Sequence, residues 1–172
     1  ITIAAETSML DVISNGRLDV GFARAYMPYE FDAFQIDMDE SRDRYTQTIQ
    51  TVIRLWEEKN ISIDTPFFAF QNANNMPNPI QKPHPPVWGA AVNSRQTFAW
   101  LGEQGFNLLI TPPAGDLIRL QEGMDIYRES FKPRHALFPQ EPQIALSLPV
   151  IVAKDQKKAI QLSDQILQNY LD

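Results

Sequence analysis

The chain has 172 residues, of which 15 are basic and 21 acidic, and a formal net charge of −6; 44% of its residues are hydrophobic and 21% charged. This length and composition are ordinary for one globular domain with a sizeable core. The acidic balance disfavours a nucleic-acid or anionic-membrane surface, because both need clustered lysine and arginine. No stretch approaches the roughly 18 apolar residues that span a membrane. The absence of cysteine excludes disulfides, zinc–thiolate sites and thiol catalysis, and it fits a cytoplasmic location.

The first third of the chain predicts a helix, a short strand and a second helix. Apolar residues at helical spacing, with a stop at Ser14-Asn15-Gly16, predict a helix over residues 1–13. Its buried face is expected to carry Ala5, Met9, Val12 and Ile13. Leu18 to Phe22 predicts a short buried strand that presents Arg24 at its end. An acidic start at Asp37 to Glu40 then precedes a second helix. The apolar face of that helix carries Tyr45, Ile49, Val52, Ile53 and Trp56.

The middle of the chain predicts a hairpin, an extended tether and two further strands. Residues 61–70 have the β-branched and aromatic content of an irregular excursion or a hairpin. The prolines between residues 76 and 86 predict an extended segment that is neither helix nor central strand. Val87 to Ala91 predicts the second core strand, and Asn93 is expected to cap the helix that follows. Residues 106–111 predict the third strand.

The last third of the chain repeats the alternation of helix and strand. An apolar stripe predicts a helix over residues 117–131, which Pro133 stops. Residues 144–152 predict the fourth strand, and Asp155 is expected to cap the last helix. The inward side of the last helix is expected to carry Ala159, Leu162, Ile166 and Tyr170.

This alternation predicts an α/β fold with a parallel sheet covered by helices. Two arrangements of such a sheet remain possible at this point, an open doubly wound sheet and a closed barrel. No Gly-x-Gly-x-x-Gly follows any predicted strand, which weakens the dinucleotide-binding interpretation. A complete (β/α)8 barrel has eight strands, so four strands amount to about half of one.

Four blocks of sequence carry a resemblance to a known family. They are Gly21-Phe-Ala-Arg24, the segment from Glu30 to Arg42, Lys82-Pro-His-Pro-Pro-Val-Trp88, and Asn93-Ser94. In this order and at these separations they resemble the bacterial-luciferase-like monooxygenase family. The resemblance implies a TIM-type barrel of which residues 1–172 form a single partial domain. That domain would comprise strands 4 to 7 with their helices, without the first three strands and the last.

The resemblance implies a flavin enzyme. Members use reduced FMN, supplied by a separate flavin reductase, and O2 to form a flavin C4a-peroxide that oxidises an aldehyde or another small organic substrate. One branch binds the deazaflavin F420 instead and transfers hydride, and this stays an alternative. A second alternative is a non-catalytic flavin-binding or scaffold remnant. The open edges of a four-strand sheet favour a homo-oligomer or a complementary chain that supplies the rest of the barrel.

Arg24 is the leading candidate for a cofactor-binding residue. A cation at the carboxyl end of a barrel strand suits a flavin phosphate or the N1 and O2 region of a reduced flavin. The alternative is a structural ion pair with Glu30 or Asp37.

A second group of candidates follows the strand at Val87 to Ala91. Asn93 and Ser94 open a helix, whose free amides and positive dipole end suit a phosphate. The resemblance implies an acid where this chain has Asn93, whereas Ser94 and Thr97 match the family pattern. Thr111, at the end of the next strand, is expected at the same rim. The predicted cofactor-binding set is therefore Arg24, Asn93, Ser94, Thr97 and Thr111, with no catalytic residue assigned.

The two histidines and the acidic run offer no metal site. His84 precedes a strand, which places it at the end of the sheet away from the site, so an ordered loop histidine is favoured over a general base. His135 follows a helix stop and is expected to be exposed. Two histidines without cysteine disfavour a transition-metal site. The acids from Asp37 to Asp43 lack the spacing of a calcium loop and predict a solvated helix start.

Overall fold

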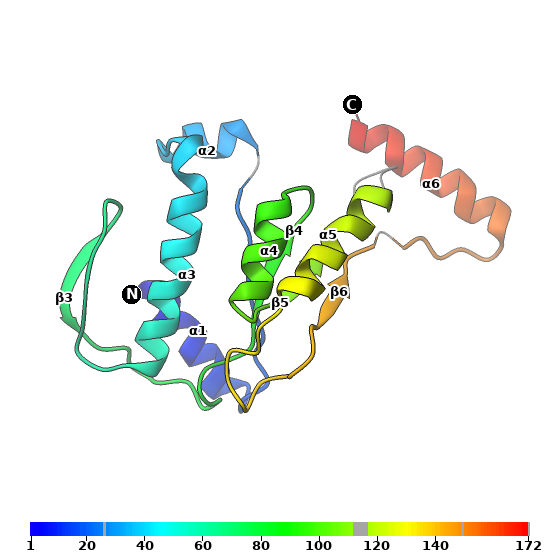
Figure 1. The fold of residues 1–172 in the computed structure, drawn as a ribbon. Coiled ribbons are helices and arrows are strands. Elements are labelled where there is room, and N and C mark those ends of the chain that lie inside the picture. Colours follow the sequence, from blue (N-terminus) through cyan, green and yellow to red (C-terminus); the bar gives the residue numbers. More distant parts are fainter. Residues whose placement is uncertain (26, 112–116, 149, 172) are drawn as a thin grey trace.

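The computed structural model describes residues 1–25, 27–111, 117–148 and 150–171, the last five by backbone alone. The helices are α1 (Thr2–Ile13), α2 (Pro28–Phe34), α3 (Ser41–Glu57), α4 (Arg95–Glu103), α5 (Leu117–Ser130) and α6 (Gln156–Leu171), with a 3-10 turn η1 (Met38–Glu40) before α3. The strands are β1 (Val20–Phe22), β2 (Ile61–Asp64), β3 (Ala69–Ala73), β4 (Val87–Ala91), β5 (Asn107–Ile110) and β6 (Ile144–Leu146) (Figure 1). None of the described helices is long and apolar enough to cross a membrane.

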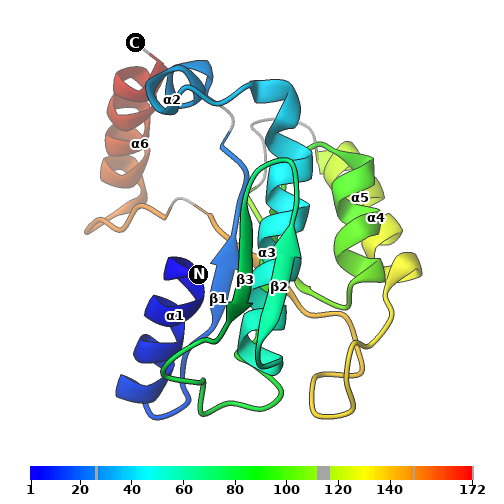
Figure 2. The same ribbon diagram turned by 90° about the vertical axis from the view of Figure 1, so that its left-hand side faces the viewer.

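The central sheet has the strand order β1-β4-β5-β6, and every neighbouring pair is parallel. The antiparallel hairpin of β2 and β3 is separate from this sheet and stands beside α3 (Figure 2). The predicted hairpin and the four predicted core strands are therefore confirmed, in the predicted chain order. Helices α4 and α5 lie side by side along one face of the sheet (Figure 1).

Among the described residues, helices pack against one face of the sheet. In β4 the residues Val87, Gly89 and Ala91 are buried, whereas the alternate residues are half-buried. Gly89 belongs to the helix-covered face, since a Cβ there would collide with the Leu101 side chain on α4. Gly21 pairs in register with Trp88 on the opposite face, and a Cβ at Gly21 would meet nothing within 4 Å. A sheet with helices on its outer face and an open inner face is half a barrel, not a doubly wound sheet.

The buried face of α1 differs from the prediction. Ala4, Ser8 and Asp11 are buried, whereas Met9, Val12 and Ile13 are exposed by 41% or more. The reason is a polar anchor: the Asp11 carboxylate accepts hydrogen bonds from the Ile80 amide (2.7 Å), the Gln81 amide (3.0 Å) and the Gln81 side chain (2.8 Å). This contact fixes the proline-rich tether to α1. It turns the apolar residues of the helix away from the described chain.

The end of the chain also departs from the prediction. The fourth strand was expected over residues 144–152, but β6 covers only Ile144–Leu146. β6 is an edge strand whose one partner, β5, ends at Ile110, so the ladder closes with the Ser147 amide on the Ile110 carbonyl (2.7 Å). Ile166, expected to be buried on α6, is 56% exposed. The Tyr170 side chain and residue 149 lie outside the described residues.

The core joins α3, α4 and α5 to the strands beneath them. Its largest fully buried side chains include Tyr127, Phe98, Phe106, Ile49 and Leu101. The Tyr127 hydroxyl donates to the Phe106 carbonyl at 2.9 Å and lies 3.2 Å from the Gln143 carbonyl. These contacts tie α5 to the segments that enter β5 and β6. The parallel registers of β1 with β4 and of β4 with β5 bring the carboxyl ends of these three strands to one edge.

Candidate anion-binding site

Two arginines and two serines meet at the carboxyl ends of β1 and β4. Arg24 follows β1 by two residues, and Ser41 and Arg42 are the first residues of α3. Ser94 is the N-cap of α4 and follows β4. Parallel strands bring their carboxyl ends to the same edge, and that edge carries the active site in barrel enzymes.

The two guanidinium groups are held by serine hydroxyls. Arg24 Nη1 donates to Ser41 Oγ at 3.3 Å, and Arg42 Nη2 donates to Ser94 Oγ at 2.9 Å. Among the residues that the structure describes, no carboxylate forms an ion pair with either guanidinium. The alternative in which Arg24 pairs with Glu30 or Asp37 is therefore not what the structure shows.

The electrostatics of this group favour a negative ligand. Partial burial lowers the pKa of Arg24, and the nearby positive charge of Arg42 lowers it further, while Tyr45 acts in the opposite direction. Burial raises the pKa of Tyr45 to about 12, with the charge of Arg24 opposing the change, so its hydroxyl stays protonated at neutral pH. Two like charges without a carboxylate partner form a site that an anion neutralises.

Helix α3 also positions the strand that presents Arg24. The Tyr45 hydroxyl donates to the Phe22 carbonyl, the last of β1, at 3.3 Å. Its ring lies against Trp100 of α4, with centroids 5.6 Å apart. The first turns of α3 thus position Arg24 in two ways. Tyr45 holds the backbone before Arg24, and Ser41 holds the Arg24 side chain.

Ser94, not Asn93, caps α4. The Ser94 side chain accepts from the Thr97 amide at 3.3 Å, and its backbone is extended, with φ −84° and ψ 107°. Asn93 stands one residue too early to cap the helix and is exposed. Thr97 is buried in the first turn of α4. The exposed Thr111 follows β5 at the same edge.

The structure therefore unites Arg24 and Ser94 from the predicted set and adds Arg42, which sequence reasoning missed. The sequence carried one signal for Arg42, which is its position as a cation in the first turn of a helix, α3. The positive end of the helix dipole disfavours a cation there unless an anion is bound nearby.

His84 lies at the other end of β4, as predicted. It is 1% exposed, and its ring is 4.8 Å from that of Phe138 and 5.6 Å from that of Trp56. Its Nδ1 lies 2.7 Å from the Pro85 carbonyl and donates to it. Burial lowers the pKa of His84 to about 4. His84 is thus a neutral packing residue far from the anion site, and His135 is exposed.

A parallel half-barrel with a cationic group at its carboxyl edge is typical of barrel enzymes that bind phosphate-bearing ligands. The model of the luciferase-like monooxygenase family matches residues 1–171, and the chain belongs to this family. The resemblance noted in the sequence is thereby confirmed.

Flavin-dependent monooxygenases are among its relatives. The oxygenase component of a flavin-dependent trigonelline monooxygenase from Acinetobacter baylyi is 32% identical over 114 residues, which are 65% of this chain and 31% of the relative. The alkanal monooxygenase alpha chain of Aliivibrio fischeri is 27% identical over 121 residues, 70% of this chain and 33% of the relative.

Solved structures share the fold. The monooxygenase RslO1 from Streptomyces bottropensis superposes with a TM-score of 0.84 at 33% identity, covering 95% of this chain and 50% of RslO1. The oxygenating constituent of 3,6-diketocamphane monooxygenase from Pseudomonas putida, solved with FMN, superposes with a TM-score of 0.76 at 16% identity over 95% of this chain and 48% of that one. The chain thus spans about half of the barrel structures it matches.

Proposed function

We propose that this chain forms the cofactor-binding half of a flavin-dependent monooxygenase, in which Arg24, Arg42 and Ser94 bind the phosphate of reduced FMN. The observation that carries the proposal is the pair of arginines at the carboxyl edge, each held by a serine and neither paired with a described carboxylate. Bound flavin would supply the electrons that activate O2 for attack on a small organic substrate, for which an aldehyde is one candidate.

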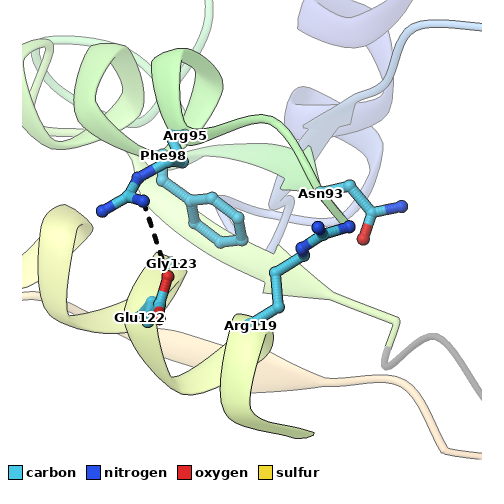
Figure 3. Close-up of a pocket in the computed structure, with 6 residues that line it drawn as sticks. All are labelled: Asn93, Arg95, Phe98, Arg119, Glu122 and Gly123. Carbon is cyan, nitrogen blue, oxygen red and sulfur yellow. Dashed lines mark ion pairs between the residues drawn. The ribbon is translucent and has the colours of Figure 1, made fainter. Parts of the chain in front are cut away.

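The residues present fit a phosphate. A guanidinium offers parallel N–H donors that match two oxygens of a phosphate, and two such groups stand at this edge. The Thr97 amide donates to Ser94, whereas the Arg95 and Gln96 amides precede the first hydrogen bond of α4 and point along its positive end. Ser94, Thr97 and Thr111 add hydroxyl groups at the same edge. Asn93 stands beside them, on the side of α4 that faces α5 (Figure 3).

The proposal also states where the other half of the barrel comes from. Within the part of the chain that the structure describes, strands β1 and β6 each have one unpaired edge, and the inner face of the sheet is open at Gly21. We propose that residues 1–172 act as one partial domain. Further strands, from the same polypeptide or from another chain, close the barrel around the flavin, and a separate reductase supplies the reduced cofactor.

Comparing FMN with riboflavin, which lacks the phosphate, tests the assignment. Flavin fluorescence titrations of the chain should show tighter binding of FMN than of riboflavin. Arg24→Gln and Arg42→Gln should each weaken FMN binding about tenfold or more, because a hydrogen bond to a charged group contributes about 1.5–3 kcal/mol. Riboflavin binding should not change. The matched control is Arg54→Gln, since Arg54 lies on α3 in an exposed pair with Glu58.

Equal affinity for FMN and riboflavin would overturn the phosphate assignment. The same titration with F420 separates the two cofactors, and tighter binding of F420 would favour the hydride-transfer alternative. Oxygen uptake with reduced FMN, measured on the closed barrel, then distinguishes an oxygenase from a flavin-binding scaffold.

A further inference from the structure

The Ser94 hydroxyl is left with one role toward a ligand, that of a hydrogen-bond donor. A serine hydroxyl has one proton to donate and two lone pairs that accept. Ser94 Oγ accepts from Arg42 Nη2 at 2.9 Å and from the Thr97 amide at 3.3 Å, which occupies both lone pairs. Within the described chain no acceptor takes the Ser94 hydroxyl proton. That proton is therefore available to an oxygen of a ligand.

The other groups between β1 and β4 are donors as well. Arg24 and Arg42 each use one N–H on a serine, and a guanidinium has five donors and no acceptor. Ser41 Oγ accepts from Arg24, and none of the described residues accepts the Ser41 hydroxyl proton. The Arg95 and Gln96 amides at the start of α4 add two further donors. A ligand at this place thus meets many hydrogens, two positive charges and few lone pairs.

The remaining polar side chains at this edge are turned elsewhere or stand farther along it. The Tyr45 hydroxyl donates to the Phe22 carbonyl. Asn93 lies on the side of α4 that faces α5, near Arg119 (Figure 3). Thr111 follows β5, one strand beyond β4. These side chains therefore leave the donor character of the Arg24–Arg42–Ser94 group unchanged.

The protein groups around this edge keep their charge between pH 5 and pH 8. Both guanidinium groups stay cationic, and Tyr45, whose pKa burial raises to about 12, stays neutral. Glu40 pairs with Arg44 and Glu122 with Arg95. The other acids of α2, η1 and the first turn of α3 pair with neither guanidinium among the described ion pairs; they are Glu30, Asp32, Asp37, Asp39 and Asp43.

Both histidines lie at the opposite end of the sheet. His84 precedes β4, and its ring lies 4.8 Å from that of Phe138. The His135 ring is 6.3 Å from the same phenylalanine ring. Histidine is the side chain that ordinarily titrates near neutral pH. A pH dependence of binding at the carboxyl edge between pH 5 and pH 8 would therefore come from the ligand.

We propose that the Arg24–Arg42–Ser94 group selects the dianion of a phosphomonoester and releases it when the phosphate takes up a proton. The inference rests on the proposed function in so far as FMN is that phosphomonoester. Two uncompensated cations match two negative charges. The second ionisation of a phosphomonoester has a pKa of about 6. Protonation removes one charge and adds an O–H that faces other donors, so affinity falls as the pH drops below about 6. A phosphodiester carries a single charge and binds weakly at any pH.

Calorimetric titration of the whole chain with methyl phosphate, dimethyl phosphate and sulfate tests the proposal. Methyl phosphate should bind about tenfold more tightly at pH 7 than at pH 5, because its dianionic fraction falls from about 0.9 to about 0.09. Sulfate carries two charges and no proton throughout this range, so its affinity should not change, which controls for changes in the protein. Dimethyl phosphate should bind at least tenfold more weakly than methyl phosphate at pH 7.

Two substitutions of Ser94 separate its donor role from its capping role, because threonine and aspartate both cap helices. Ser94→Thr retains the O–H and should retain methyl phosphate binding with its pH dependence. Ser94→Asp puts an acceptor and a negative charge in its place and should weaken binding at least tenfold. Arg54→Gln, in an exposed pair with Glu58 on α3, is the matched control and should bind like the wild type.

Equal affinity for methyl phosphate at pH 5 and pH 7 would overturn the proposal, and so would a pH dependence that sulfate shares. Dimethyl phosphate that binds as tightly as methyl phosphate, or Ser94→Asp that binds like Ser94→Thr, would also contradict it. The flavin assignment fails separately. If FMN binds no more tightly than riboflavin while methyl phosphate keeps its tenfold dependence on pH, the flavin proposal is wrong and the dianion selectivity stands.

Discussion

Removing Arg42 should abolish most of the stabilisation that phosphate gives to this protein. Each guanidinium at the carboxyl edge contributes about 2 kcal/mol to an anion through charge-assisted hydrogen bonds. Two of them give about 4 kcal/mol, which corresponds to a dissociation constant of about 1 mM. At about 50 mM phosphate, linkage then stabilises the folded state by about 2.3 kcal/mol.

The expected change in melting temperature follows from the length of the chain. For 172 residues the unfolding entropy is about 0.36 kcal/mol/K, so phosphate should raise the melting temperature by about 6 °C. In Arg42→Gln, loss of about 2 kcal/mol raises the dissociation constant to about 30 mM and leaves a rise of about 2 °C. Without phosphate the variant should be no less stable than the wild type, because the repulsion between Arg24 and Arg42 is gone.

Differential scanning calorimetry in phosphate and in sodium chloride of equal ionic strength makes this measurement. Comparing proteins within one buffer removes the general stabilising effect of phosphate on folded chains. The Arg54→Gln variant should keep the wild-type rise, since Arg54 lies on α3 in an exposed pair with Glu58. The same rise in wild type and Arg42→Gln would refute the reasoning.

Three further predictions concern the scaffold. Tyr127→Phe removes the buried hydroxyl bonded to the Phe106 carbonyl and should lower the free energy of unfolding in urea by about 1–2 kcal/mol, or about 4 °C in melting temperature. Gly102→Ala places a Cβ 2.6 Å from the Tyr127 carbonyl and should cost about 1–3 kcal/mol; an unchanged urea midpoint would contradict this packing. His84 is neutral when folded, with a pKa of about 4 against about 6.5 when unfolded, so the unfolded chain binds the extra proton between these values and stability falls as pH drops from about 6.5 towards 4. Urea titrations across this range should show a shallower fall for His84→Gln, and parallel curves would refute the assignment.

The fold was largely predictable because each β-α unit carries its own local signals. Residues Val87 to Ala91 are a short apolar run, and the stop at Ser14-Asn15-Gly16 marks the end of α1 where the structure ends it. The buried face of α1 was not predictable from apolar spacing, since the polar Asp11 faces inward to bind amides about 70 positions later in the chain. The length of β6 was not predictable either, because it depends on where its partner β5 ends.

The site was predictable in part. Arg24 and Ser94 follow strands, and the position after a barrel strand is itself the signal. Arg42 was hidden among acids that resemble an ordinary helix start. Its partner Ser94 is 52 positions away, and only the fold brings α3 beside α4.

Gly21, the middle residue of β1, is a position where the needs of folding and of ligand binding can be told apart. Its place in β1 has room for a methyl group on the inner side, and alanine restricts the unfolded chain more than glycine does. Nothing within the described chain therefore requires a bare backbone there. In the proposed flavin enzyme, the glycine would preserve clearance, so that a flat ring could approach the strand without meeting a side chain. We therefore expect a substitution at residue 21 to change ligand binding more than it changes the stability of the fold.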